Sequence, residues 1–95
     1  MYSVVRQYQH ILNHEDFIRH VRDEFLPELR QLPGFAAFHL VDVGEEGGRM
    51  VSITYFETPE TAAEANNHAV AWVRANMGLF QAASVVEEGP VVVSS

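Results

Sequence analysis

His68 and Trp72 are the residues whose types and spacing are best suited to chemistry. They lie four positions apart in a segment that predicts a helix, so they share one face of it. A neutral histidine can accept a proton near pH 7, and an indole ring gives a planar ligand an aromatic wall. The pair therefore predicts a catalytic site with His68 as the base. The simpler alternative is a tryptophan packed in the core beside a surface histidine.

Three further residues are candidates for binding a substrate. Asn66 and Asn67 lie in mid-helix, where Asn is a poor helix former, and one of them could hydrogen-bond a ligand carbonyl; we select Asn67. Tyr55 could donate a hydrogen bond from a strand, and His39 lies on another predicted strand. For each of these residues a purely structural role, exposed or packed, is the more common alternative.

Charged and metal-ligating residues give weaker signals. Arg6 and Arg49 could neutralise an anionic substrate, although salt bridges within an acidic protein are the simpler expectation. His10 and His14 have a spacing that suggests a metal site, with acidic residues beside His14. The helix begins only at His14, so the two imidazoles need not share a face, and no second cluster completes a ligand set. We therefore expect no metal.

The composition argues against several functional classes. There are 13 acidic residues against six arginines, giving a net charge of −7, whereas nucleic-acid binding needs a clustered basic face. The absence of Cys excludes a disulfide framework, a thiol nucleophile and a Cys-based zinc site. No leader-like segment and no apolar run of membrane-spanning length occur, so we expect a soluble, cytoplasmic protein without nucleic-acid or membrane partners.

The elements that must position these residues follow the order β-α-β-β-α-β. Alternating aromatic and β-branched residues predict strands at 2–8, 35–43 and 50–56, and a last strand at 84–86 and 91–93, interrupted at Gly89-Pro90. In the second strand we expect Phe35, Ala37, His39 and Val41 on one face. Glycines at 44–48 predict a hairpin turn.

Two helices connect these strands. The first begins after the N-cap Asn13 and ends at Pro33-Gly34, with a kink or a restart at Pro27. The second begins at the N-cap Thr58 and runs to Met77, with Gly78 placed to end it.

This order predicts one α+β domain spanning residues 1–95, with a ferredoxin-like fold. Its four-stranded antiparallel sheet has two helices on one face. Apolar side chains also point to the other face, which the helices do not cover. A second copy is the simplest cover, so we expect a homodimer formed through the sheet face.

Three segments resemble a known family. ELRQLPGF, YFETPETAAEA and AWVRANM, with the Gly-rich hairpin, are similar to the antibiotic biosynthesis monooxygenase family of dimeric α+β barrels, over essentially the whole chain. The resemblance implies a ligand pocket between the sheet and the helices. It also implies cofactor-free oxidation of anthrone- or quinol-type aromatics; Trp72 matches a pocket tryptophan, and His68 stands where relatives have an asparagine.

The resemblance leaves three functions open. The first is a cofactor-independent monooxygenase that oxidises a small electron-rich aromatic with O₂, using His68 as proton acceptor and Trp72 as wall. The second is a non-catalytic small-molecule-binding or stress-related homodimer, since a fold does not determine a function. The third, haem binding with ring cleavage, fits less well because the first strand lacks the asparagine of haem-degrading relatives.

Overall fold

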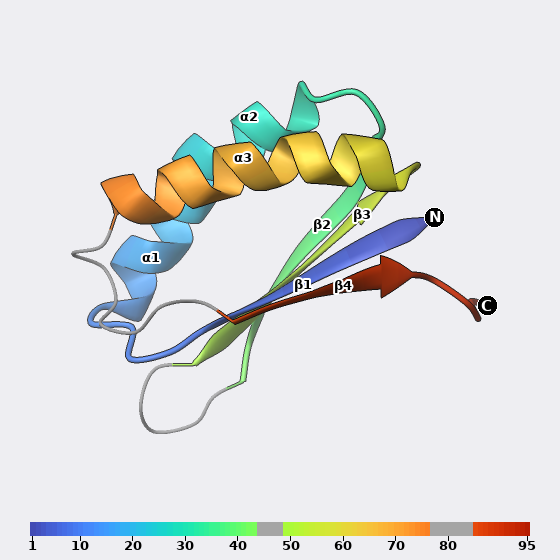
Figure 1. Ribbon diagram of the computed structural model, residues 1–95. Coiled ribbons are helices and arrows are strands. Elements are labelled where there is room, and N and C mark those ends of the chain that lie inside the picture. Colours follow the sequence, from blue (N-terminus) through green and yellow to red (C-terminus); the bar gives the residue numbers. More distant parts are fainter. Residues whose placement is uncertain (44–48, 77–84) are drawn as a thin grey trace.

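The computed structural model describes residues 1–43, 49–76 and 85–95, which form a sheet covered on one face by helices (Figure 1). The elements, in chain order, are β1 (Tyr2–Tyr8), α1 (His14–His20), η1 (Val21–Phe25), α2 (Leu26–Arg30), β2 (Phe35–Asp42), β3 (Met50–Phe56), α3 (Pro59–Ala75) and β4 (Val85–Pro90). This is the predicted β-α-β-β-α-β order. The expected hairpin turn at 44–48 and the helix end at Met77 and Gly78 lie outside the described residues.

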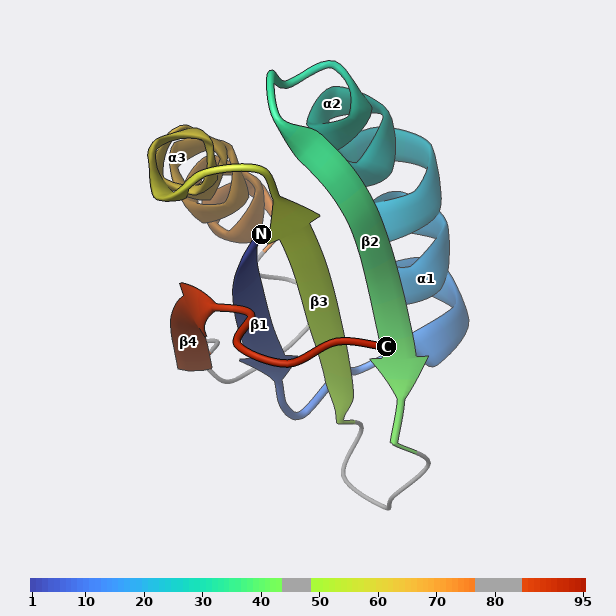
Figure 2. The same ribbon diagram turned by 90° about the vertical axis from the view of Figure 1, so that its right-hand side faces the viewer.

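The four strands are antiparallel and lie side by side in the order β2-β3-β1-β4 (Figure 2). The predicted ferredoxin-like fold is therefore confirmed. β1 is an interior strand, between β3 and β4, and its residues alternate between the helix-covered face and the other face. Every second residue of β1 and β3 is buried beneath the helices: Val4, Arg6, Tyr8, Met50, Ser52, Thr54 and Phe56.

An aromatic cluster joins the helices to the sheet. The Trp72 ring on α3 lies with its centroid 5.9 Å from that of Phe17 on α1 and 5.3 Å from that of Phe25 on η1. Phe17 in turn meets Tyr8 of β1 edge-on at 5.0 Å. Phe17 is completely buried, and such aromatic pairs contribute about 0.5–1.5 kcal/mol beyond their area burial. The cluster fixes the spacing between the two helical segments.

The first helical segment is continuous in space but changes its winding. It starts where the Asn13 side chain accepts a hydrogen bond from the backbone N–H of Asp16 at 3.0 Å, as predicted. Residues 21–25 form a π-helical turn, and α2 then restarts with Pro27 in its first turn. Proline cannot donate the next backbone hydrogen bond, so the restart predicted at Pro27 is confirmed. The wider π-turn was not predicted.

The start of α3 is held by a cap and by a close approach of the β2 entrance. Thr58 accepts a hydrogen bond from the Thr61 backbone N–H at 3.2 Å, with Pro59 in the first turn, as expected. Gly34 has φ +78°, and its backbone oxygen accepts a 2.8 Å hydrogen bond from the N–H of Glu57. A Cβ on Gly34 would lie 2.7 Å from Oγ1 of Thr61. The two most characteristic sequence segments, LPGF and ETPETA, are therefore in contact.

Two sequence-based expectations about strands were wrong. A β-bulge between Phe35 and Ala37 breaks the alternation of β2, so Phe35 packs with Phe56 on the helix-covered side, apart from His39. The last strand is a single segment, Val85–Pro90, that includes Gly89-Pro90, and Val91–Val93 are not part of it. β4 is an edge strand with one neighbour, which is where a proline is tolerated.

No described helix covers the second face of the sheet (Figure 1). Val5, Val51, Ile53 and Tyr55 of the two central strands point to this face and are only partly buried. β2 adds Val41, which is exposed. This face is the apolar surface from which a dimer was predicted.

Candidate functional site

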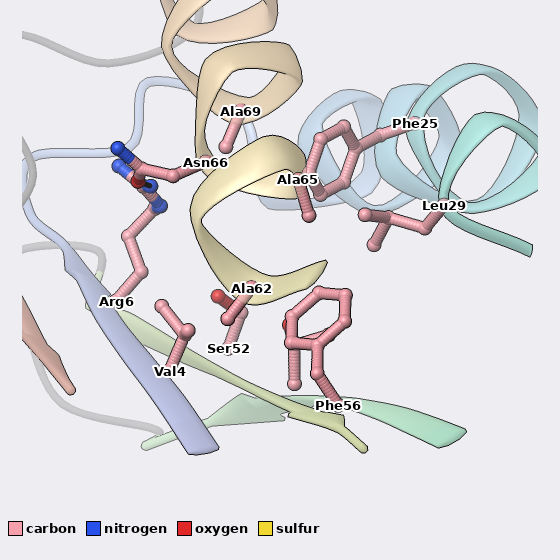
Figure 3. A pocket seen from close by; sticks show the side chains of 11 residues that line it. Val4, Arg6, Phe25, Leu29, Ser52, Phe56, Ala62, Ala65, Asn66 and Ala69 are labelled. Atoms are coloured by element: carbon pink, nitrogen blue, oxygen red, sulfur yellow. Dashed lines mark hydrogen bonds between the residues drawn. The ribbon is translucent and has the colours of Figure 1, made fainter. Parts of the chain in front are cut away.

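The most unusual buried group is the guanidinium of Arg6, on the interior strand β1. Arg6 is only 5 % exposed, although charged side chains are rarely buried unless they are paired. Its Nη2 donates a 2.8 Å hydrogen bond to Oδ1 of Asn66, on α3. Figure 3 shows the Arg6 side chain rising from the sheet to meet Asn66 at the edge of a cavity. The two residues thus bridge the sheet and the helix layer with polar atoms.

This cavity lies between the sheet and the helices. Its apolar lining comes from β1, η1, α2, β3 and α3 and consists of Val4, Phe25, Leu29, Phe56, Ala62, Ala65 and Ala69. Its polar lining consists of Arg6, Ser52, Thr54 and Asn66. The enclosed volume is about 20 Å³, which is room for roughly one water molecule. A small-molecule site usually combines an apolar lining with a few convergent polar groups, and this cavity has that composition in a much smaller volume.

Sheet register and helix period explain why these polar groups converge. Arg6 of β1 lies opposite Ser52 of β3, and Val4 lies opposite Thr54, so all four point to the same face. On α3, Asn66 lies four residues after Ala62 and three before Ala69, which places it on the buried alanine face. Alanines allow this helix to approach the sheet closely. The side chain of Asn66 can therefore reach Arg6.

Tyr8 extends the polar groups into the core. Burial is the main reason why the pKa of Tyr8 is raised from 10.0 to about 12, against opposing effects of the Arg6 charge and a hydrogen bond with Ser52. The phenol is therefore neutral at physiological pH. Together, Tyr8, Ser52, Arg6 and Asn66 form a polar line that leads from the core to the edge of the cavity.

A second, open hollow of about 350 Å³ lies between α3 and the η1–α2 segment. It is lined by Glu24, Glu28, His68, Ala71, Trp72, Ala75 and Asn76. Because Phe25 lines the inner cavity and its ring is 5.3 Å from that of Trp72, these two rings stand between the two hollows. Nε1 of Trp72 is buried and has no hydrogen-bond partner among the described residues.

The predicted site residues fall in three places. His68 and Trp72 both line the open hollow, His68 exposed and Trp72 only 7 % exposed. Asn67 is exposed and lines neither hollow. Tyr55 and His39 lie on the other face of the sheet, with ring centroids 6.4 Å apart. The roles assigned to these five residues stay predictions.

Sequence reasoning did not select the polar residues that line the cavity. Asn66 was weighed but Asn67 was chosen, although the alanines at 62, 65 and 69 mark the face that Asn66 shares. Ser52 and Thr54 were not considered, although their two-residue spacing between Met50 and Phe56 places them on the buried face of β3. Arg6 was considered for an anionic substrate and does line the cavity.

The described part of the chain has neither a metal-binding cluster nor a helix suited to cross a membrane. No group of three or more His, Asp or Glu side chains there could hold a metal ion, and His14 lies 3.4 Å from Asp42. Of the helices described, none is both long and apolar enough to cross a membrane.

Solved structures with the same fold include known oxygenases, whereas no family model and no curated protein matches the sequence. The cofactor-independent oxygenase SnoaB from Streptomyces nogalater is 13 % identical with a TM-score of 0.77, covering 98 % of this chain and 94 % of its own. A monooxygenase from the gene ActVA-Orf6 of Streptomyces coelicolor, solved with Nanaomycin D, is 12 % identical with a TM-score of 0.73, covering 98 % and 92 %. Rv0793 from Mycobacterium tuberculosis is 18 % identical with a TM-score of 0.75, covering 99 % and 98 %. The chain therefore has the fold of the antibiotic biosynthesis monooxygenase structures.

Proposed function

We propose that the protein is a cofactor-independent monooxygenase that oxidises a small electron-rich aromatic of the quinol or anthrone type with O₂. The observation that carries the proposal is the cavity between sheet and helices, where Arg6 and Asn66 meet over an apolar lining. The fold shared with SnoaB and the ActVA-Orf6 monooxygenase supports it. In this proposal the aromatic ring enters the apolar chamber as Phe25 moves toward the open hollow, and the ring oxygen points toward Arg6.

In this reaction the substrate supplies all the electrons. In an anthrone, an activated CH₂ becomes a carbonyl that takes one oxygen atom of O₂, and the second atom leaves as water with the two hydrogens. In a quinol, one oxygen atom enters a ring C–H bond as a hydroxyl group, and the second leaves as water with the two hydrogens that the ring loses on becoming a quinone. Ionisation of the substrate comes first, because the anion passes an electron to O₂ more readily than the neutral ring. Arg6 and Asn66 stabilise the resulting oxyanion in a site of low dielectric. His68 and Trp72, the predicted base and wall, line the open hollow on the other side of the Phe25–Trp72 boundary, so His68 accepts the proton only when the bound substrate extends across that boundary.

A homodimer through the uncovered sheet face is part of the proposal. Burying Val5, Val51, Ile53 and their neighbours against a second copy would remove an apolar surface from water. Light scattering at micromolar concentration measures the mass directly. A single species at 10.7 kDa would contradict the dimer.

Oxygen uptake by the metal-free protein, with a panel of anthrones and hydroquinones, tests the activity. The key comparison is Asn66→Ala with Asn67→Ala, which remove the same side chain from adjacent positions, one lining the cavity and one exposed. We expect Asn66→Ala to reduce uptake about 100–1000-fold, as loss of an oxyanion donor does, and Asn67→Ala to leave it within about twofold. His68→Ala tests the base, and Trp72→Phe tests the wall.

Each pattern of results has a definite meaning. Uptake lost in Asn67→Ala and kept in Asn66→Ala would move the site away from the cavity. Uptake unaffected by His68→Ala would remove that residue as the base. Uptake no faster than the spontaneous reaction, for every compound in the panel, would contradict the oxygenase itself.

The second candidate function is a non-catalytic small-molecule-binding protein on the same fold. The small enclosed volume of about 20 Å³ favours it, because the chamber is largely filled by its own side chains. Binding of panel compounds without any oxygen uptake would establish this alternative.

A further inference from the structure

We propose that the cavity selects aromatic ligands that carry an anionic oxygen, and that Arg6 is the residue that recognises this charge. The inference rests on the cavity being the ligand site, as proposed above, and it does not depend on the oxygen chemistry. It assigns to Arg6 a role in specificity and names the class of ligand: a planar ring bearing a carboxylate or an ionised hydroxyl.

The charge distribution of the chain supports this selection. The sequence carries 13 acidic residues and a net charge of −7, yet Arg6 is the one charged residue among the described side chains that line the cavity. A positive lining within an acidic protein favours an anion in the cavity over a neutral or cationic ligand.

The hydrogen-bonding groups of the cavity point to the same class. The guanidinium of Arg6 offers five N–H donors in a planar fork, and Nη2 donates one of them to the neutral amide oxygen of Asn66. Ser52 and Thr54 add hydroxyl groups that can donate from the neighbouring strand. A charge-assisted hydrogen bond is roughly twice as strong as a neutral one. A ligand anion can therefore take the place of the Asn66 oxygen on Arg6, and Asn66, being only half-buried, can turn so that its Nδ2 donates to the same anion.

Room for the ring comes from the Phe25–Trp72 boundary. The enclosed space of about 20 Å³ does not hold an aromatic ring, whereas the hollow on the other side of these two rings measures about 350 Å³. Phe25 belongs to the π-helical turn and lines the cavity, where Figure 3 shows its ring beside Ala65. The centroid of its ring is 5.3 Å from that of the Trp72 ring, which lines the open hollow. Movement of Phe25 toward the open hollow enlarges the chamber beside Arg6.

Calorimetric binding of a matched pair of probes tests the inference. 2-Naphthoate and 2-naphthamide have nearly the same shape and differ in charge at pH 7. We expect the wild-type protein to bind naphthoate at least about tenfold more tightly, a difference of about 1.4 kcal/mol. Arg6→Met removes the charge while keeping an unbranched chain of similar length in a buried position, and should bring the two affinities within about twofold of each other. Arg49→Met, at an exposed arginine outside the cavity, should leave the preference unchanged.

Two further variants keep the test decisive. Arg6→Lys should retain part of the preference, because it keeps the charge without the planar fork. Phe25→Ala should tighten naphthoate binding by enlarging the chamber, and its preference over the amide should persist. Circular dichroism identifies any variant that does not fold.

Several results would overturn the inference. These are equal affinities for the two probes, a preference that survives in Arg6→Met, a preference lost equally in Arg49→Met, or no binding of either probe at millimolar concentration. Binding is measured under nitrogen, so it is separate from turnover. A preference for naphthoate without oxygen uptake in the panel would keep this inference and remove the oxygenase; uptake without the preference would do the reverse.

Discussion

Gly34→Ala is expected to destabilise the protein strongly, for two independent reasons. Gly34 has φ +78°, a left-handed conformation that costs a residue with a Cβ about 1–2 kcal/mol. The new Cβ would also lie 2.7, 2.8 and 2.9 Å from three side-chain atoms of Thr61, closer than such atoms normally approach. Overpacking of this kind typically costs about 1–3 kcal/mol.

The two penalties together give roughly 2–5 kcal/mol, and we expect about 3 kcal/mol because Thr61 is only partly buried and can shift. For a domain of this size, about 3 kcal/mol lowers Tm by roughly 12–24 °C. Urea unfolding followed by circular dichroism gives the free energy, and a thermal scan gives Tm. Gly89→Ala is the matched control, since a Cβ there meets nothing within 4 Å; its effect should stay within about 0.5 kcal/mol.

A double-mutant cycle separates the two penalties. Thr61→Ala removes two of the three crowding atoms, and by itself costs about 1 kcal/mol because Oγ1 accepts a hydrogen bond from the N–H of Thr58 at 3.3 Å. Gly34→Ala combined with Thr61→Ala should therefore cost about 1 kcal/mol less than the sum of the single changes. Strict additivity would refute the steric part of the reasoning. A Gly34→Ala cost no larger than that of Gly89→Ala would refute both parts.

Two further predictions concern buried polar atoms. Folding raises the pKa of Tyr8 from 10.0 to about 12, so the neutral side chain contributes roughly 2–3 kcal/mol to the free energy of unfolding. This contribution is fully present below pH 10 and is lost as the pH rises through 12. Urea unfolding from pH 8 to 12 should show this alkaline loss in the wild type and a smaller loss in Tyr8→Phe; identical slopes would contradict it. Since Nε1 of Trp72 has no partner among the described residues, Trp72→Phe should cost only about 1–2 kcal/mol, against about 3–5 kcal/mol for Trp72→Ala. A cost of Trp72→Phe well above about 2 kcal/mol, measured in urea, would indicate that the indole N–H has a hydrogen-bond partner.

The order and type of the elements could be predicted because the local signals agree with the fold. The cap at Asn13, the Thr58-Pro59 helix start and the break at Pro27 each act within a single turn. Whether a helix starts or breaks at such a position depends on residues adjacent in the sequence, and these can be read directly. The bulge at Phe35 could not be predicted in this way, because it depends on pairing with Phe56 across the sheet.

The candidate site was predicted less well, because its residues come from separate elements. His68 and Trp72 do share a helix face, as their spacing requires, but the face borders the open hollow. The buried alanines determine which face of α3 packs on the sheet. Asn66 shares that face and lines the cavity, whereas Asn67 does not. The burial of Arg6 has no distinctive sequence signal. Its side chain points to the face of the sheet opposite to those of Val5 and Gln7, as alternation in any strand requires, and the sequence does not show which face is covered.

The interior position of β1 has a consequence for how the protein folds. Arg6 pairs with position 52 on one side and position 86 on the other, and its side chain reaches position 66. Contacts between residues so far apart in sequence slow folding, because long loops must close before the contacts form. During synthesis, one edge of β1 stays unpaired until the segment containing β4 has been made, and an open strand edge can pair with other chains. The ligand site draws its residues from β1 through α3, so it is complete only after α3 has been made; a bound ligand can stabilise the finished domain but cannot guide the earlier part of the nascent chain toward it.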